Sequence, residues 1–173
     1  VILAAILLKM GGYGFLRFSL GMFPIASEYF VPLIFTLSVI AIIYTSLVAL
    51  MQEDMKKLIA YSSVAHAGYM LAGLTAVGAW TWGPSFAGKE GEAALLVMTA
   101  LLFHMLVLVA FKLGAFLVLS ILESDGDSSR LSSLGGLAKR EPLLAFAMFI
   151  FMISLAGVPP MAGFLSKLMV IMG

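Results

Sequence analysis

Three lysines, Lys9, Lys112 and Lys167, lie within long apolar stretches of the sequence. Placing a lysine at the centre of a membrane helix costs about 2.5–3.5 kcal/mol, whereas one leucine returns only about 0.3–0.6 kcal/mol. Stability therefore gives no reason for a chain to carry three such residues. A desolvated lysine amine releases its proton more readily, and a proton relay requires this property. We predict that these three amines carry protons.

Two histidines, His66 and His104, lie in the same kind of apolar stretch. Imidazole titrates near neutral pH, so it suits a proton carrier, although a hydrogen-bonded structural role is the open alternative. His104 and Lys112 are eight residues apart, which on a helix separates them by about 80° around the axis and about 12 Å along it. Water would have to bridge that gap, and the apolar Leu108 lies between them.

The carboxylates are placed differently from the amines. All nine fall in predicted loops or at predicted helix ends. The three lysines therefore either pair with carboxylates outside this sequence or face water inside the protein. The alternative is snorkelling, in which a lysine near a helix end extends its amine to the lipid headgroups.

Long apolar stretches predict the elements that carry these residues. Of the 173 residues, 62% are hydrophobic and 11% are charged, whereas a soluble domain has about 25% charged residues. About 20 apolar residues are needed for a helix to cross a bilayer. The chain is therefore predicted to be all-α, a single polytopic transmembrane domain over residues 1–173. The predicted spans are residues 1–20, 30–51, 58–82, 93–122 and 142–172.

The last predicted span carries the stretch "GVPPMAG", whose Pro159–Pro160 pair removes backbone donors and breaks the helix. Broken helices at membrane depth persist only where protein or a water-filled cavity satisfies the freed groups, and they recur at transporter ion sites. A break seven residues before Lys167 therefore strengthens the prediction that Lys167 carries protons.

Several function classes are excluded within this chain. There is no cysteine, so disulfides, cysteine-ligated clusters and thiol catalysis are absent. No nucleotide-binding motif or basic run is present, so we expect no cofactor, no metal and no nucleic acid. Because the sequence begins and stops inside apolar runs, we expect it to be a piece of a longer protein.

Basic residues are unequally divided between the predicted loops. The loops 21–29 and 83–92, with Arg17 and Lys89 nearby, hold two, whereas 52–57 and 123–141 hold five. The positive-inside rule therefore places loops 52–57 and 123–141 in the cytoplasm.

Four stretches together resemble the antiporter-like, proton-translocating membrane subunits of respiratory NADH:quinone oxidoreductase (complex I), of the chain-2 (N) and chain-4 (M) types. They are "AILLKMGGYGFLRFSLGMFP", "QEDMKKLIAYSSVAHAGYML", "FHMLVLVAFKLGAFLVLS" and "SLAGVPPMAGFLSKLMV". The first resembles the chain-4 type, and the second and fourth resemble the chain-2 type, so the paralogue stays open.

The resemblance implies a larger inverted-repeat fold, of which this chain would supply about five helices. It implies that Lys9 is the central relay lysine and that Lys167 is the charged residue on the broken helix. It places His66, His104 and Lys112 on the hydrophilic axis between them. It also implies a bacterial inner membrane, other membrane-arm subunits as partners, internal water, and redox chemistry in other subunits of the enzyme.

Two alternatives remain open from the sequence. One is a subunit of a multisubunit Na⁺/H⁺ antiporter or of a membrane-bound hydrogenase, which belong to the same superfamily. The other is a non-conducting membrane scaffold that only anchors helices. Substitution of Lys9 or Lys167 separates a relay from a scaffold, because only a relay would lose proton pumping while staying assembled.

Overall fold

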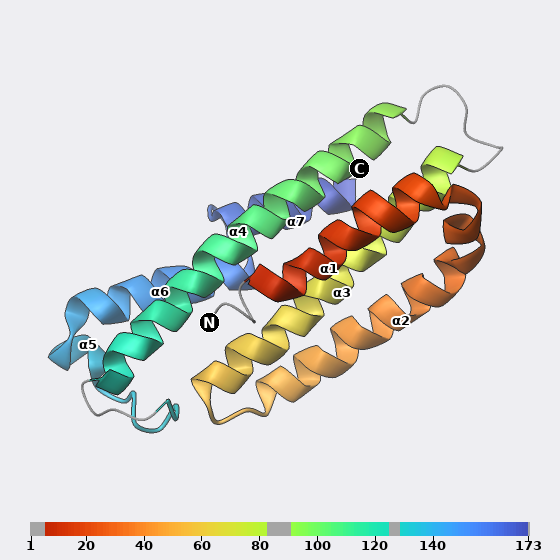
Figure 1. The fold of residues 1–173 in the computed structure, drawn as a ribbon. Coiled ribbons are helices and arrows are strands. Elements are labelled where there is room, and N and C mark those ends of the chain that lie inside the picture. The colour runs from red at the N-terminus through yellow and green to blue at the C-terminus, as the bar shows by residue number, and fades with distance from the viewer. Residues whose placement is uncertain (1–5, 83–90, 125–128, 173) are drawn as a thin grey trace.

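A computed structural model describes residues 6–82, 91–124 and 129–172 of the chain. These residues form a helical bundle without strands (Figure 1). Its elements are α1 (Leu8–Gly14), the π-helix η2 (Phe15–Leu20), α2 (Pro24–Leu50), α3 (Met55–Trp82), α4 (Gly91–Ser124), α5 (Leu137–Arg140), α6 (Pro142–Ala156) and α7 (Ala162–Met172). The predicted all-α class is confirmed. Helices are expected here, because in hydrocarbon each backbone group must find its partner within its own segment.

Two helical segments, Pro24–Leu50 and Leu95–Ser124, are long and apolar enough to cross a membrane, and α6 and α7 are shorter apolar helices. The first begins six residues before the predicted span 30–51, because Pro24 occupies the first helical position, where proline loses no intrahelical bond. The crossing of a membrane by the other predicted spans stays a prediction, and residues 1–5 of the first lie outside the described residues.

The helix α3 is the centre of the bundle, with α2 along one side and α4 along another (Figure 1). Gly68 allows the close approach to α2, since a Cβ there would lie 3.0 Å from the Ser38 carbonyl oxygen. Such small residues are what lets membrane helices pack tightly. On its other side α4 contacts both α6 and α7. The three helices α3, α4 and α7 thereby bring distant parts of the sequence together.

The last predicted span is broken, as expected, but the break begins earlier than the proline pair. Helix α6 ends at Ala156, and Gly157 follows with a φ of +84°. The Gly157 and Val158 amides donate to the carbonyls of Ser154 and Ile153, at 3.2 and 3.2 Å, which is the Schellman ending of a helix. Glycine therefore stops α6, and the prolines keep the following residues from resuming it.

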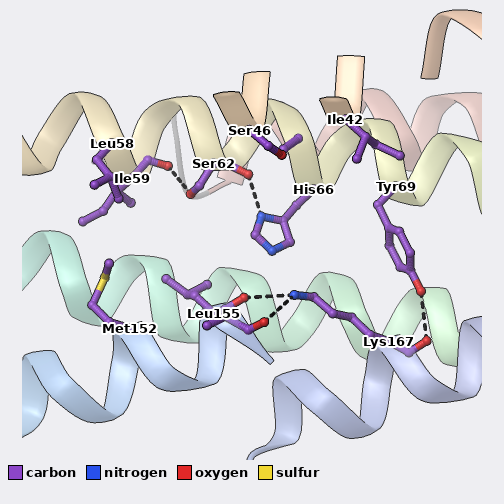
Figure 2. Close-up of a pocket in the computed structure, with 12 residues that line it drawn as sticks. Ile42, Ser46, Leu58, Ile59, Ser62, His66, Tyr69, Met152, Leu155 and Lys167 are labelled. Carbon is purple, nitrogen blue, oxygen red and sulfur yellow. Dashed lines mark hydrogen bonds between the residues drawn. The ribbon is translucent and has the colours of Figure 1, made fainter. Parts of the chain in front are cut away.

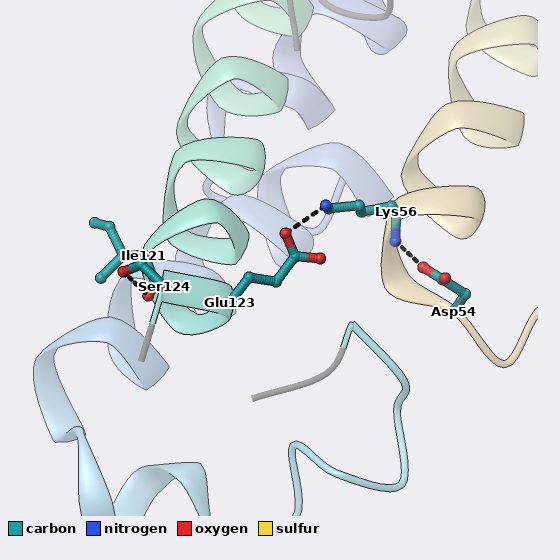
Figure 3. Close-up of polar contacts among 5 residues, drawn as sticks. All are labelled: Asp54, Lys56, Ile121, Glu123 and Ser124. Atoms are coloured by element: carbon teal, nitrogen blue, oxygen red, sulfur yellow. Dashed lines mark hydrogen bonds and ion pairs between the residues drawn. The ribbon is translucent and has the colours of Figure 1, made fainter. Parts of the chain in front are cut away.

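The predicted loop 52–57 lies beside the described residues of the predicted loop 123–141, and Figure 3 shows Lys56 reaching Glu123 there. The Leu131 amide donates to the Glu53 carbonyl at 2.8 Å, and the Met55 amide donates to the Ser129 carbonyl at 2.9 Å. The Lys56 ammonium forms a 2.5 Å salt bridge with Glu123. Which side of a membrane these loops face stays a prediction. Lys89 and most of the loop 83–92, used for that prediction, lie outside the described residues.

Asp54 caps the start of α3 in this loop cluster. Its carboxylate accepts a 2.8 Å hydrogen bond from the Lys56 amide, which is the ordinary N-cap arrangement. Burial by itself would raise the pKa of Asp54, but the amides of Lys56 and Lys57, the Ser129 hydroxyl and the Lys57 charge outweigh burial and lower the pKa. The cap is therefore strongest when Asp54 is ionised.

Candidate functional site

Lys112 is fully buried at the middle of α4, with 0% of its surface exposed. Its amine donates a 2.8 Å hydrogen bond to the hydroxyl of Ser63, which is also fully buried on α3. The Ser63 hydroxyl in turn donates to the Ile59 carbonyl at 3.1 Å. Among the described residues no carboxylate forms a salt bridge with Lys112. The amine is thus held inside the bundle by a neutral hydroxyl.

The imidazoles of His66 on α3 and His104 on α4 face each other, with ring centroids 5.8 Å apart. The His66 Nδ1 lies 2.5 Å from the Ser62 carbonyl oxygen, which can only accept, so this nitrogen carries the hydrogen. The His104 Nδ1 lies 2.8 Å from the Ser166 hydroxyl. That hydroxyl donates its own hydrogen to the Gly163 carbonyl, so the His104 Nδ1 also acts as the donor.

Both histidines therefore keep Nε2 as their proton-accepting nitrogen when neutral. The His104 Nε2 is buried and has no hydrogen-bond partner among the described residues. A buried polar atom without a partner usually marks a place for an internal water. This atom can accept a proton delivered through such a water.

Tyr69 ties this histidine pair to the last helix. Its ring lies edge-on to His104, with centroids 5.4 Å apart. Its hydroxyl donates a 2.9 Å hydrogen bond to the main-chain carbonyl of Lys167 on α7. Tyr69 therefore fixes the position of α7 relative to α3 and α4.

The Lys167 amine lies at the break between α6 and α7. It donates to the carbonyl oxygens of Leu155 and Ala156, each at 3.1 Å (Figure 2). These two carbonyls belong to the last turn of α6, where the helix dipole places partial negative charge. The broken helix thus supplies the counter-charge that no carboxylate among the described residues supplies through a salt bridge.

Lys9 lies on α1 and is buried, with 3% of its surface exposed. Its charge acts electrostatically on both His104 and Lys112. Lys112 and Lys167 likewise act on the two imidazoles. A proton added at Lys112 or Lys167 therefore changes the energy of a proton on either imidazole.

The structure brings His66, His104 and Lys167 together around Tyr69 and Ser166. Lys112 is held separately between α4 and α3 by Ser63, and Lys9 lies within electrostatic reach of His104 and Lys112. Leu108, which lies between His104 and Lys112 along α4, is buried in the apolar core, and a water bridge between these two residues stays a prediction. Both residues make their polar contacts with other helices. The sequence did not identify three residues that hold these groups in place: Ser63, Tyr69 and Ser166.

Sequence carried a signal for two of the three missed residues. Ser63, His66 and Tyr69 follow one another at intervals of three residues, which places them along one face of a helix. Ser166 precedes Lys167 directly and gave no such signal.

A cavity of about 450 Å³ opens beside His66, Tyr69 and Lys167 (Figure 2). Polar groups from Ser46, Ser62, His66, Tyr69 and Lys167 line one part of it. The rest is apolar: Ile42, Leu58, Ile59, Ala65, Met152, Leu155 and Ala156. The cavity lies among α2, α3, α6 and α7 and gives His66 and Lys167 access to a space large enough for several waters.

A family model described as "NADH:quinone oxidoreductase/Mrp antiporter, TM" matches residues 1–88 and 91–173. The chain belongs to this family.

The similar proteins include subunits of both predicted types, M (chain 4) and N. Subunit M of NADH-quinone oxidoreductase from Rhodobacter capsulatus is 42% identical over 173 residues, which is all of this chain and 31% of the relative. Chain 4 of NADH-ubiquinone oxidoreductase from Chondrus crispus is 42% identical over 99% of this chain and 32% of its own length. Subunit N from Chloroflexus aggregans is 42% identical over 83% of this chain and 27% of its own.

The predicted resemblance to the antiporter-like membrane subunits is therefore confirmed, and the chain spans about a third of the length of these relatives. The M-type relative matches over the whole chain and the N-type relative over 83% of it, and which of the two types this chain represents stays open. The predicted lack of a cofactor and of a metal stays a prediction.

Proposed function

We propose that this chain forms part of a proton pathway across an energy-transducing membrane. Electron transfer from NADH to quinone would take place in other subunits of a complex I-type assembly. The observation that carries the proposal is the group of ionisable side chains inside the bundle on α3, α4 and α7, of which Lys112 and His104 are buried and His66 and Lys167 are half-buried. Two of its amines, Lys112 and Lys167, form no salt bridge with a carboxylate among the described residues. An amine without a carboxylate partner releases its proton more readily than an amine in a salt bridge.

The proposed order of transfer begins at Lys9 and passes to Lys112, which Ser63 holds in place. It continues through His66 and His104 and ends at Lys167. Internal water would join the members that do not touch. In each step a proton leaves a nitrogen of one residue and is taken up by a nitrogen of the next, so no electrons and no cofactor are needed.

Three features support Lys112 and the histidine pair as transfer groups. The Ser63 hydroxyl accepts from the Lys112 ammonium, and it could donate to the neutral amine by turning its hydrogen away from the Ile59 carbonyl. The His104 Nε2 is ready to accept a proton. The charges of Lys112 and Lys167 act on both imidazoles, so a proton reaching Lys112 would repel a proton on the histidine pair toward a neutral Lys167.

The family and the loop charges support the setting of this pathway. A bacterial inner membrane, with residues 52–57 and 123–141 on its cytoplasmic side, is the location we propose. The partners would be other membrane-arm subunits, the lipid bilayer and internal water.

The experiment that tests the proposal uses the full-length subunit in its assembled complex. Lys112→Met and Lys167→Met each remove an amine and keep a side chain of similar length. NADH-driven acidification of proteoliposomes should fall at least tenfold, while the amount of assembled complex is unchanged. The matched control is Lys139→Met, which removes an exposed lysine from α5 and should pump normally.

Retention of pumping by both amine variants, with assembly intact, would leave the scaffold alternative standing. The family description also covers Mrp antiporters, so sodium transport is the second candidate. Pumping that depends on Na⁺ in the wild-type complex would favour it.

A further inference from the structure

The last four carbonyls of α6 have no partners within the helix, as at every helix C-terminus. Amides of the break satisfy the first two, those of Ile153 and Ser154. The other two, those of Leu155 and Ala156, both accept from the Lys167 amine at 3.1 Å. A single side chain from the second half of the broken helix thus completes the end of the first half.

The surroundings of this amine are those of a cation site. Its two oxygen partners are main-chain carbonyls, and the C-terminal end of the helix dipole adds partial negative charge. Unwound carbonyls and half-helix C-terminal ends are groups that coordinate monovalent cations in membrane transporters. Here an ammonium on a four-carbon tether occupies that position.

Gly157 leaves the room that the tether needs. A Cβ at this residue would lie 3.1 Å from the Lys167 Nζ and 3.2 Å from its Cδ. The positive φ of Gly157 also turns the chain away from α6, which leaves the Leu155 and Ala156 carbonyls open to a group arriving from α7.

The cavity of about 450 Å³ provides a way in for a free ion. Lys167, Leu155 and Ala156 all line it, together with the Ser46 and Ser62 side chains. Its lining contains no carboxylate, so among these residues the carbonyls of α6 are the groups that would attract a cation.

We propose that the carbonyl end of α6 is a monovalent-cation site that the Lys167 amine fills, and that Lys167 thereby keeps free Na⁺ out. Lys167 is then the residue that restricts the broken helix to protons. This inference rests on the proposed proton pathway, because it explains why the pathway would end at an amine rather than at a free ion.

The test compares two variants of the full-length subunit in its assembled complex. Lys167→Ala removes the amine and leaves space, whereas Lys167→Met removes the amine and fills the space with an uncharged chain. The probes are Na⁺ and methylammonium, each measured by equilibrium binding to the purified complex. Lys167→Ala should bind one more cation per subunit than either the wild type or Lys167→Met, and both probes should compete for it.

Equal cation binding by all three proteins would overturn the inference, as would extra binding by Lys167→Met. If Lys167→Ala assembles poorly because the end of α6 is uncapped, methylammonium present during growth and purification should restore assembly. Failure of that rescue counts against the site.

Proton pumping is measured in parallel, so the two proposals can fail separately. Lys167→Ala with normal pumping and a new cation site would refute the relay role of Lys167 and keep the site. Loss of pumping without a new cation site would refute the cation site and keep the relay role of Lys167.

Discussion

The hydrogen bond between Lys112 and Ser63 allows a quantitative test of the charge on the central amine. Both side chains have 0% of their surface exposed, and their 2.8 Å contact joins α4 to α3. Ser63→Ala removes the acceptor and Lys112→Met removes the donor. The two single variants and the double variant together form a double-mutant cycle, which isolates the energy of this one contact.

The expected coupling energy depends on the protonation state of the amine. A hydrogen bond to a charged group contributes about 1.5–3 kcal/mol, whereas hydrogen bonds between membrane helices average about 0.6 kcal/mol. Since Lys112 is fully buried and no salt bridge to it is found among the described residues, an ammonium there should depend strongly on Ser63. We expect a coupling of about 1.5–3 kcal/mol if the resting amine is protonated.

The assay is reversible unfolding of the purified full-length subunit in mixed micelles, with pumping measured on the same variants. Ser62→Ala is the matched control, because the neighbouring Ser62 hydroxyl donates to the Ile59 carbonyl within α3 and should not couple to Lys112. A coupling near 0.6 kcal/mol would show a neutral resting amine. A coupling below about 0.3 kcal/mol, no larger than the usual error of additivity, would refute the assignment of Ser63 as the residue that holds Lys112.

Three further substitutions have defined outcomes. Gly163→Ala should lower stability by about 1–3 kcal/mol in thermal unfolding, because the added Cβ would overlap the Ser154 carbonyl oxygen at the end of α6. The control Gly12→Ala should leave stability unchanged, because the nearest atom to its Cβ is 3.9 Å away. Tyr69→Phe should slow pumping without loss of assembled complex, since it removes the hydrogen bond to α7 and keeps the ring beside the histidine pair; unchanged pumping would remove Tyr69 from the pathway. The lowered pKa of Asp54 means that its contribution to stability is full above about pH 4 and is lost as the pH falls through its folded pKa. Asp54→Asn should therefore flatten the acid limb of the plot of unfolding free energy against pH. A plot identical to that of the wild type would contradict the role of Asp54 as a cap.

The sequence allowed much of the fold to be predicted because membrane helices are encoded locally. Each helix must satisfy its own backbone and face lipid, so its length and apolar composition are visible in consecutive residues. The broken helix was visible in the same way, through its glycine and proline pair. Its exact ending was not, since a Gly157 with positive φ rather than the prolines terminates α6.

Candidate residues were also visible, but their partners were not. A lysine or histidine inside an apolar run is costly wherever it finally points, so Lys9, His66, His104, Lys112 and Lys167 could be identified from their types alone. The contacts that give them roles come from far along the chain. Lys112 meets a serine 49 residues away, His104 meets one 62 residues away, and Tyr69 reaches a carbonyl 98 residues away.

The sequence by itself therefore determined that the chain is helical, belongs in a membrane and carries five costly ionisable groups in its apolar segments. Only the tertiary structure decided that the Lys167 amine closes the end of α6 and that the two histidines face each other across α3 and α4. The physical reason is that burial cost belongs to a residue and its immediate neighbours, whereas a hydrogen bond needs two groups within about 3 Å. Only the packing of the helices brings two groups from distant parts of the chain within that distance.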